Sequence, residues 1–196
     1  MTARHDAVLL AAGGSRRLGH PKQMLTVGGE TLLVRAARLL AATGPGRLVV
    51  VLGAHADALA SWLDEGIVRV NPDWRDGMAS SLQVAARALD DRERPVLVAV
   101  VDQPALDAMH LAHLLAAYDG RRDVVTAYGD ARGVPAVVRA STLRRAPSLQ
   151  GDQGLRALWA GESPLAVRAD ALERDIDTPG DVDIAMRDGL LDPARG

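Results

Sequence analysis

The residues best suited to chemistry lie in one loop near the start of the chain. In the segment LLAAGGSRRLGHPKQML (residues 9–25), an apolar run ends at two glycines, Gly13 and Gly14. A hydroxyl, that of Ser15, and two spaced cations, Arg17 and Lys22, follow in the same loop. Glycines let backbone N–H groups approach a ligand closely, because no Cβ stands in the way. A hydroxyl donor and two fixed positive charges suit a chain of phosphates. We therefore expect this loop to bind a polyphosphate.

The loop differs from the two common phosphate-binding motifs. A P-loop has Lys and then Ser or Thr directly after its second glycine, whereas here Gly19 is followed by His20 and Pro21. The dinucleotide motif needs a glycine two positions after Gly13, where this chain has Ser15. An ordinary glycine turn with surface arginines is the alternative explanation, and the position of the loop directly after a predicted strand favours binding.

A carboxylate stands where a second predicted strand ends. Asp102 directly follows the apolar run VLVAVV (residues 96–101). A carboxylate at that edge of a sheet can hold a Mg²⁺ ion that keeps most of its waters and bridges to phosphate oxygens. The alternative is that Asp102 caps a helix that begins near Leu106, although Asp107 is better placed for that role.

A third candidate segment is GMASSLQVA, where small residues follow Gly77 at a predicted helix start. The first turn of a helix offers free N–H groups and the positive end of the helix dipole. Ser81 is either a ligand-facing residue or a plain N-cap. Trp74, in NPDW, lies at the same predicted edge, and both packing and ligand contact are open for it.

The elements that must position these residues alternate along the chain. Short Val- and Leu-rich runs predict strands over 7–10, 48–52, 68–70, 96–101, 124–127 and 136–138, and amphipathic segments predict helices over 32–42, 56–63, 80–89 and 109–118. Strand–helix alternation predicts right-handed crossovers and a parallel sheet covered on both faces. The predicted fold is a three-layer α/β/α sandwich, Rossmann-like, with a mostly parallel sheet. Such sheets bind ligands beyond the carboxyl ends of their strands.

Composition sets the class of protein. The 196 residues are 48% hydrophobic and 24% charged, with a formal charge of −2 and no cysteine. This balance argues against nucleic acid as a partner, and no apolar run is long enough for a membrane helix. We expect a cytoplasmic protein with one domain over residues 1–190 and a loose tail over 191–196.

Several segments of the chain resemble a known family. LAAGGSRRLGHPK (residues 10–22) matches the signature of the MobA-like nucleotidyltransferases, which include the molybdenum cofactor guanylyl- and cytidylyltransferases. The resemblance continues through NPDWRDGMASSL, VDQPAL, GVPAVV, GDQGLRAL and DIDTPGD, and these later blocks are most similar to the cytidylyltransferase branch.

The resemblance implies roles for individual residues. Backbone N–H groups of the loop and Ser15 would lie along the triphosphate, with Arg17 on the outer phosphates and Lys22 near the α-phosphate. Asp102 and Asp177 would hold the metal, Mg²⁺ or Mn²⁺, although Asp177 could instead only set up the turn before Thr178. The nucleotide-binding set it implies comprises Leu10, Ala11, Ala12, Gly13, Gly14, Ser15, Arg17, Lys22, Gly77, Ser80 and Ser81, with Arg17, Lys22 and Asp102 as the catalytic residues.

The resemblance also implies a reaction. A nucleoside monophosphate would move from CTP, or GTP, to the phosphate of molybdopterin, with release of pyrophosphate, and a molybdoenzyme or its maturation chaperone would be a protein partner. The alternatives are a transferase that acts on a sugar phosphate or alditol phosphate, a non-catalytic nucleotide- or pterin-binding maturation protein, and a dinucleotide-dependent oxidoreductase.

Overall fold

A computed structural model describes residues 4–64 and 66–193. Seven strands form one sheet in the order β5-β4-β1-β6-β8-β7-β9, and β2 and β3 form a separate hairpin. Only β8 runs antiparallel to its neighbours in the large sheet. The strands are β1 (Asp6–Ala11), β2 (Thr26–Val27), β3 (Glu30–Thr31), β4 (Leu48–Leu52), β5 (Ile67–Val70), β6 (Val96–Val100), β7 (Val124–Tyr128), β8 (Ala131–Val138) and β9 (Leu165–Arg168).

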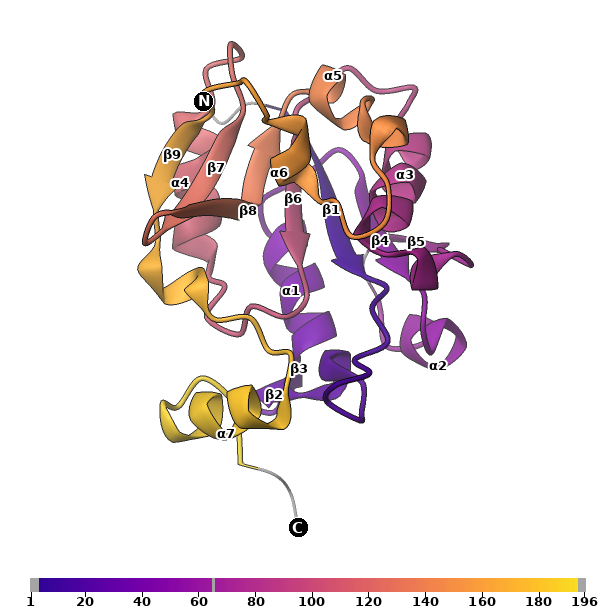
Figure 1. Cartoon of the computed structure of the whole chain (residues 1–196), viewed down its shortest axis with the longest axis vertical. Coiled ribbons are helices and arrows are strands. Elements are labelled where there is room, and N and C mark those ends of the chain that lie inside the picture. Colours follow the sequence, from indigo (N-terminus) through magenta and orange to yellow (C-terminus); the bar gives the residue numbers. More distant parts are fainter. Residues whose placement is uncertain (1–3, 65, 194–196) are drawn as a thin grey trace.

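Helices cover both faces of the sheet (Figure 1). They are α1 (Leu32–Ala41), α2 (Ala56–Ala60), α3 (Met78–Ala88), α4 (Ala108–Ala117), α5 (Ala140–Leu143), α6 (Leu155–Leu158) and α7 (Pro179–Arg187). The central strand β1 shows why both faces are needed, since all six of its residues are buried. Leu9 belongs to the core cluster that contains residues of α1 and α4 on one face, and Leu10 belongs to the cluster that contains residues of α3 and α6 on the other. These contacts confirm the predicted three-layer α/β/α sandwich.

The sheet brings two predicted site segments together. β1 pairs in parallel with β6, with Leu10 opposite Val100. The glycine loop leaves the carboxyl end of β1, and Asp102 follows the carboxyl end of β6. In the sheet, β1 has β4 on one side and β6 on the other, so the strand order reverses at β1. The ligand crevice of an open α/β sheet is therefore expected between the carboxyl ends of β1 and β6.

The elements differ from prediction in a few places. The hairpin β2–β3 and the strand β9 were not predicted, because each is short and only half-buried. Helix α2 ends at Ala60 rather than at residue 63. In the segment DIDTPGD, Thr followed by Pro is typical of a helix start, and Thr178 caps α7 with Pro179 as its first residue.

The prediction of a loose tail over 191–196 is wrong for its first residues. Leu191 is buried, and the backbone N–H of Asp192 donates to the Thr26 carbonyl at 2.8 Å. The Asp192 carboxylate accepts from the N–H groups of Gly28 and Gly29 in the β2–β3 turn at 2.8 and 2.7 Å. The tail is held because it satisfies donors of a turn that has no strand neighbour, and residues 194–196 lie outside the described residues.

None of the helices in the described part of the chain has both the length and the apolar character of a membrane span.

Candidate functional site

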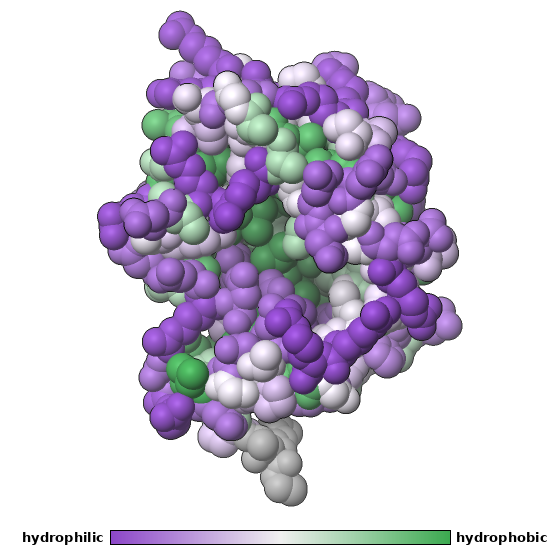
Figure 2. Space-filling model, in the orientation of Figure 1, coloured by the Kyte–Doolittle hydropathy of each residue, from purple (hydrophilic) through white to green (hydrophobic). Residues whose placement is uncertain are grey.

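A pocket of about 610 Å³ opens at the carboxyl ends of β1 and β6. The space-filling view shows a hollow near the middle of this face, with apolar residues at its floor and hydrophilic residues around its rim (Figure 2). Leu10, Ala11 and Ala12 line the pocket, together with Gly13, Gly14 and Ser15. The structure therefore places the whole start of the predicted nucleotide-binding loop against one cavity.

The loop is folded by its own side chains. Ser15 has a φ of +49°, and its hydroxyl oxygen accepts from the backbone N–H of Lys22 at 3.0 Å. The buried Gln23 amide donates to the carbonyl oxygens of Ala11 and Gly13 at 2.8 and 2.9 Å. Ser15 thus closes the loop as an acceptor, a role that differs from the one predicted for it, while its own O–H remains able to donate.

Trp74 packs against this loop. A Cβ on Gly14 would lie 2.6 Å from Cζ3 of the Trp74 ring, so only glycine fits at that position. The guanidinium carbons of Arg16 and Arg75 lie 5.5 and 4.4 Å from the centroid of the same ring. The side chain of Trp74 therefore both packs and lines the pocket.

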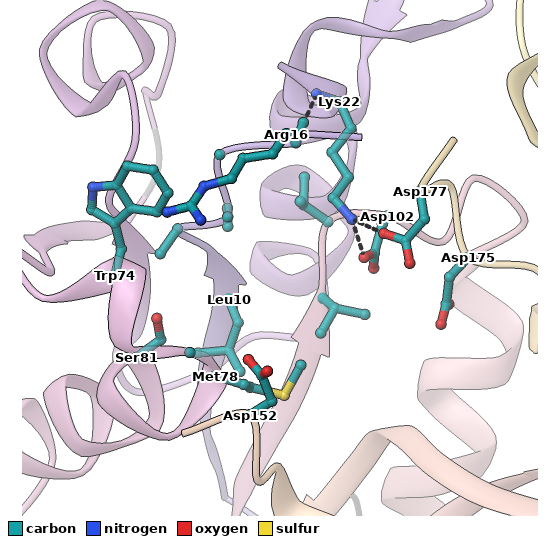
Figure 3. Close-up of a pocket in the computed structure, with 18 of the residues that line it drawn as sticks. Leu10, Arg16, Lys22, Trp74, Met78, Ser81, Asp102, Asp152, Asp175 and Asp177 are labelled. Carbon is teal, nitrogen blue, oxygen red and sulfur yellow. Dashed lines mark hydrogen bonds and ion pairs between the residues drawn. The ribbon is translucent and has the colours of Figure 1, made fainter. Parts of the chain in front are cut away.

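Lys22 joins the loop to the two predicted carboxylates (Figure 3). Its Nζ donates to Oδ2 of Asp102 at 2.6 Å, to Oδ1 of Asp177 at 3.0 Å and to the Ile176 carbonyl at 3.1 Å. Arg17 donates from Nη2 to Oδ2 of Asp177 at 2.7 Å. Sequence separations of 80 and 155 residues are closed here, and all four predicted charged residues meet at one side of the pocket.

The electrostatics follow from burial and this charge pairing. Burial lowers the pKa of Lys22, but the nearby Asp102 and Asp177 carboxylates outweigh it, so the pKa is raised above its ordinary value. Burial raises the pKa of Asp177, but Lys22 and Arg17 outweigh that effect and the pKa is lowered. Burial, and then repulsion from the Asp102 carboxylate, raise the pKa of Asp175 to about 7. Lys22 and Asp177 are thus charged at neutral pH, and Asp175 is close to its midpoint.

The donor set can accept a hard divalent cation. Asp102 Oδ1 is buried and has no hydrogen-bond partner among the described residues, and the other carboxylate oxygen shares Lys22 Nζ with Asp177. In the described part of the chain, no group of three or more His, Cys, Asp or Glu residues could hold a metal ion. Mg²⁺ is commonly bound by one or two carboxylates together with substrate phosphates, so the pair Asp102 and Asp177 fits this kind of site.

The alternatives for the two aspartates are resolved by their contacts. Asp107, not Asp102, caps α4, because its carboxylate accepts from the His110 N–H at 2.8 Å. Asp177 does more than shape a turn, because its carboxylate pairs with Lys22 and Arg17.

The start of α3 differs from prediction. Ser80 does not line the pocket, and its hydroxyl lies within hydrogen-bond distance of two acceptors, the carbonyl oxygens of Asp73 at 2.9 Å and Gly77 at 2.8 Å. A Cβ on Gly77 would lie 2.6 Å from Oδ1 of Asp152, and Ala79 N–H donates to the Gly151 carbonyl, so this helix start is covered by its own chain. At least one of the backbone N–H groups predicted to be free at this helix start, that of Ala79, is therefore already hydrogen-bonded within the protein.

Ser81 lines the pocket and is buried, and its hydroxyl accepts from the Asn71 amide at 3.0 Å. It is not the N-cap of α3, because the helix begins at Met78 with Gly77 before it.

Sequence reasoning missed several residues of the pocket. The missed residues are Arg16, Arg75, Met78, Asp152 and Asp175, and the internal support Gln23. The segments that carry Asp152 and Asp175, GDQGLRAL and DIDTPGD, stand out in the sequence only by their resemblance to the family, because a single Asp in a loop gives no signal of its own. Gln23 gave no signal either, because its burial, and with it the need for hydrogen-bond partners, follows only from the folded loop.

Comparisons with known proteins found relatives of this chain both by sequence and by structure. The family model described as the MobA-like NTP transferase domain matches residues 7–168. Nicotine blue oxidoreductase of Paenarthrobacter nicotinovorans is 38% identical over 161 residues, which are 76% of this chain and 78% of that protein. The bifunctional protein GlmU of Bifidobacterium adolescentis is 32% identical over 69% of this chain, which spans only 32% of GlmU.

Solved structures share the whole fold. The Rv0371c homologue from Mycobacterium sp. strain JC1 has a TM-score of 0.81 at 30% identity, covering 97% of this chain and 98% of that one. Rv0371c of Mycobacterium tuberculosis, solved in complex with manganese, has a TM-score of 0.78 at 26% identity, covering 94% and 98%. The molybdopterin-guanine dinucleotide biosynthesis protein A of Archaeoglobus fulgidus has a TM-score of 0.69 at 18% identity, covering 93% and 97%, and shows the fold alone.

Proposed function

Because the chain belongs to the family of MobA-like NTP transferase domains, we propose that it moves CMP from CTP to the phosphate of molybdopterin and releases pyrophosphate. The family gives the general reaction, nucleotidyl transfer. One observation of the structure supports this general reaction, which is that Lys22 Nζ lies within hydrogen-bond distance of both Asp102 and Asp177 in the lining of the glycine-loop pocket. CTP and molybdopterin are proposed from the resemblance of the later sequence blocks to the cytidylyltransferase branch. The absence of cysteine fits a cytoplasmic location.

The reaction needs little covalent chemistry from the protein. An oxygen of the acceptor phosphate forms a bond to the α-phosphorus of the nucleotide, the bond to the bridging oxygen breaks, and pyrophosphate leaves with the electron pair. The acceptor phosphate is ionised at neutral pH, so no side chain has to act as a base. The protein must instead bring two anions into line and neutralise charge.

The residues present fit that task. The glycine loop offers backbone N–H groups along the phosphates, and Lys22 and Arg17 offer positive charge at the side where Asp102 lies. Asp102 and Asp177 would hold Mg²⁺ or Mn²⁺, which supplies further positive charge to phosphate oxygens when it is bound. The manganese complex of Rv0371c, a structure at 26% identity, supports a divalent metal in this fold.

The nucleotide and the acceptor can be tested together. Purified protein is incubated with each of the four NTPs, Mg²⁺ and molybdopterin, and pyrophosphate release is measured. We expect release with CTP that depends on the acceptor. Asp102→Asn should lower turnover about 10²–10³-fold while the protein remains folded, and the exposed Asp90→Asn is the matched control outside the pocket.

Each other outcome indicates a different function. Release with GTP, or with a sugar phosphate or alditol phosphate as acceptor, indicates a related transferase, and GlmU among the relatives makes the sugar phosphate worth including. Nucleotide binding by calorimetry without any pyrophosphate indicates a maturation protein that carries nucleotide or pterin.

An oxidoreductase is the second candidate, because nicotine blue oxidoreductase is 38% identical over 76% of this chain. A fold can host unrelated activities, so the site must decide between them. A visible absorbance spectrum of bound flavin, or consumption of a nicotinamide cofactor in place of pyrophosphate release, would support this candidate.

A further inference from the structure

Two consecutive arginines of the glycine loop have different partners. Arg17 pairs with Asp177 at 2.7 Å, whereas the guanidinium of Arg16 lies over the Trp74 ring at 5.5 Å from its centroid. Figure 3 shows the Arg16 side chain extended toward Trp74, on the other side of the loop from Lys22 and the aspartates. Among the described residues, Arg16 has no carboxylate partner. The loop therefore carries one cation that no anion neutralises.

The Trp74 ring, which lies against Arg16, packs tightly on the backbone of the glycine loop. The Trp74 indole fits only because Gly14 has no Cβ, and a Cβ on Gly53 would lie 2.6 Å from that of Trp74. A second guanidinium, that of Arg75, lies 4.4 Å from the ring centroid. The loop backbone, Trp74 and the two arginines thus form one contiguous wall of the pocket.

Charge is distributed unevenly between the two sides of the loop. On one side Arg17 and Lys22 meet Asp102 and Asp177, so two cations balance two carboxylates. On the other side Arg16 and Arg75 lie over an uncharged ring. The pocket lining also includes Asp152 and Asp175, but Arg16 and Arg75 are the two cations of the lining that form no ion pair among the described residues. The most highly charged part of an anionic ligand is attracted to these two unpaired charges.

We propose that Arg16 binds the outer phosphates of the nucleotide and that Trp74 is the positioning residue that holds Arg16 over the pocket. The proposal rests on nucleotide transfer as the function. The α-phosphate lies toward Lys22 in that function, so the β- and γ-phosphates extend along the loop toward Arg16.

A tryptophan face suits this task better than a carboxylate. A guanidinium that lies over a ring keeps its in-plane N–H groups available, whereas a carboxylate partner would use two of them. Arg–phosphate contacts are charge-assisted and often bidentate, and they are stronger than a solvent-exposed cation–π contact. Arg16 can therefore leave the ring for phosphate without first breaking an ion pair.

Calorimetry of three anions tests the role of Arg16. Wild type and Arg16→Ala are titrated with CTP, inorganic tripolyphosphate and CMP in the presence of Mg²⁺. We expect Arg16→Ala to weaken CTP and tripolyphosphate about 10- to 100-fold, the loss of one or two charge-assisted hydrogen bonds, and to leave CMP unchanged. The control is Arg122→Ala, which removes the same charge from an exposed residue outside the pocket.

The role of Trp74 has its own readouts. Tripolyphosphate should change the tryptophan fluorescence of wild type, and the change should be lost in Trp74→Phe and in Arg16→Ala. Trp74→Phe keeps an aromatic face and should retain most of the affinity for tripolyphosphate, whereas Trp74→Ala should lose part of it. In turnover assays Arg16→Ala should raise the KM for CTP far more than it lowers kcat.

The outcomes separate this inference from the proposed function. Wild type that binds neither CTP nor tripolyphosphate would overturn both. Wild type that binds them, with Arg16→Ala binding equally well, would overturn the role of Arg16 alone. An equal loss of CTP, tripolyphosphate and CMP would also overturn it, because a general disturbance of the pocket affects all three.

Discussion

Replacing Lys22 by methionine removes the positive charge that holds two aspartates together. The Lys22 side chain is 11% exposed, Asp102 is 19% exposed and Asp177 is 42% exposed. Removing one partner of a buried ion pair lowers the free energy of unfolding by about 3–5 kcal/mol. Because Asp102 is partly exposed, we expect the loss of the Lys22–Asp102 pair to lie at the lower end of that range. The more exposed Asp177 adds at most about 1 kcal/mol, and methionine recovers some energy because no ammonium has to be buried.

The net loss for Lys22→Met is therefore about 2–4 kcal/mol. For a domain of this size each kcal/mol lowers the Tm by roughly 2–4 °C, so we expect a decrease of roughly 5–15 °C. Circular dichroism at 222 nm during heating measures it. Below the Tm the variant should be folded yet lose about 10²-fold or more in the rate of pyrophosphate release, because the charge next to the reacting phosphates is gone.

The pH dependence gives a second measurement of the same pairing. The pKa of Lys22 is raised in the folded protein, so its contribution to stability is complete below the ordinary titration range of lysine, near pH 10.4. That contribution is lost as the pH rises through the folded-state pKa. Wild type should lose stability along this alkaline limb, and Lys22→Met should lose less.

A double-mutant cycle with Asp102→Asn decides whether the two residues act on each other. We expect a coupling energy of about 1–3 kcal/mol, with the double variant more stable than the sum of the single effects, because the second change removes the uncompensated carboxylate. Additive effects, or a Tm for Lys22→Met within about 1 °C of wild type, would show that the cluster does not hold Lys22 as described.

Two further predictions concern parts of the fold remote from the pocket. Asp123 is buried at the amino end of β7 and accepts from Arg139 and from Trp159 Nε1, both at 2.9 Å, so Asp123→Ala should cost about 3–5 kcal/mol in urea unfolding while the CTP affinity of the folded protein stays unchanged. Burial lowers the pKa of His110 against the opposing effect of Asp107, so the unfolded chain binds a proton that the native chain does not as the pH falls below about 6.5. Wild type should therefore lose up to about 1.4 kcal/mol per pH unit more than His110→Asn between pH 6.5 and the folded pKa, and equal slopes in urea titrations would contradict this.

Much of the fold could be predicted from the sequence because its signals are local. Continuous apolar runs such as VLVAV at 96–100 indicate a strand that is covered on both faces, and β6 is one. The capping pattern at Thr178 and Pro179 fixed the start of α7. Short, half-buried elements such as β9 lacked that signal, since their pairing depends on neighbours distant in sequence.

The sequence by itself determined which residues could contact phosphate and metal, because glycines, Arg17, Lys22 and Asp102 carry that chemistry at recognisable positions after two apolar runs. Only the tertiary structure decided how they are used. The parallel pairing of β1 with β6 sets Lys22 against Asp102, and the return of the chain after β9 adds Asp177.

The same holds for the residues that the sequence did not single out. Arg16 and Arg17 are neighbours of the same residue type, so composition alone does not distinguish their roles. They differ in the structure because Arg16 lies over Trp74 and Arg17 pairs with Asp177. Side-chain type is a local property of the chain, whereas the partner of a charge is set by packing between segments far apart, and at this pocket the partner determines which cation stays free for a ligand.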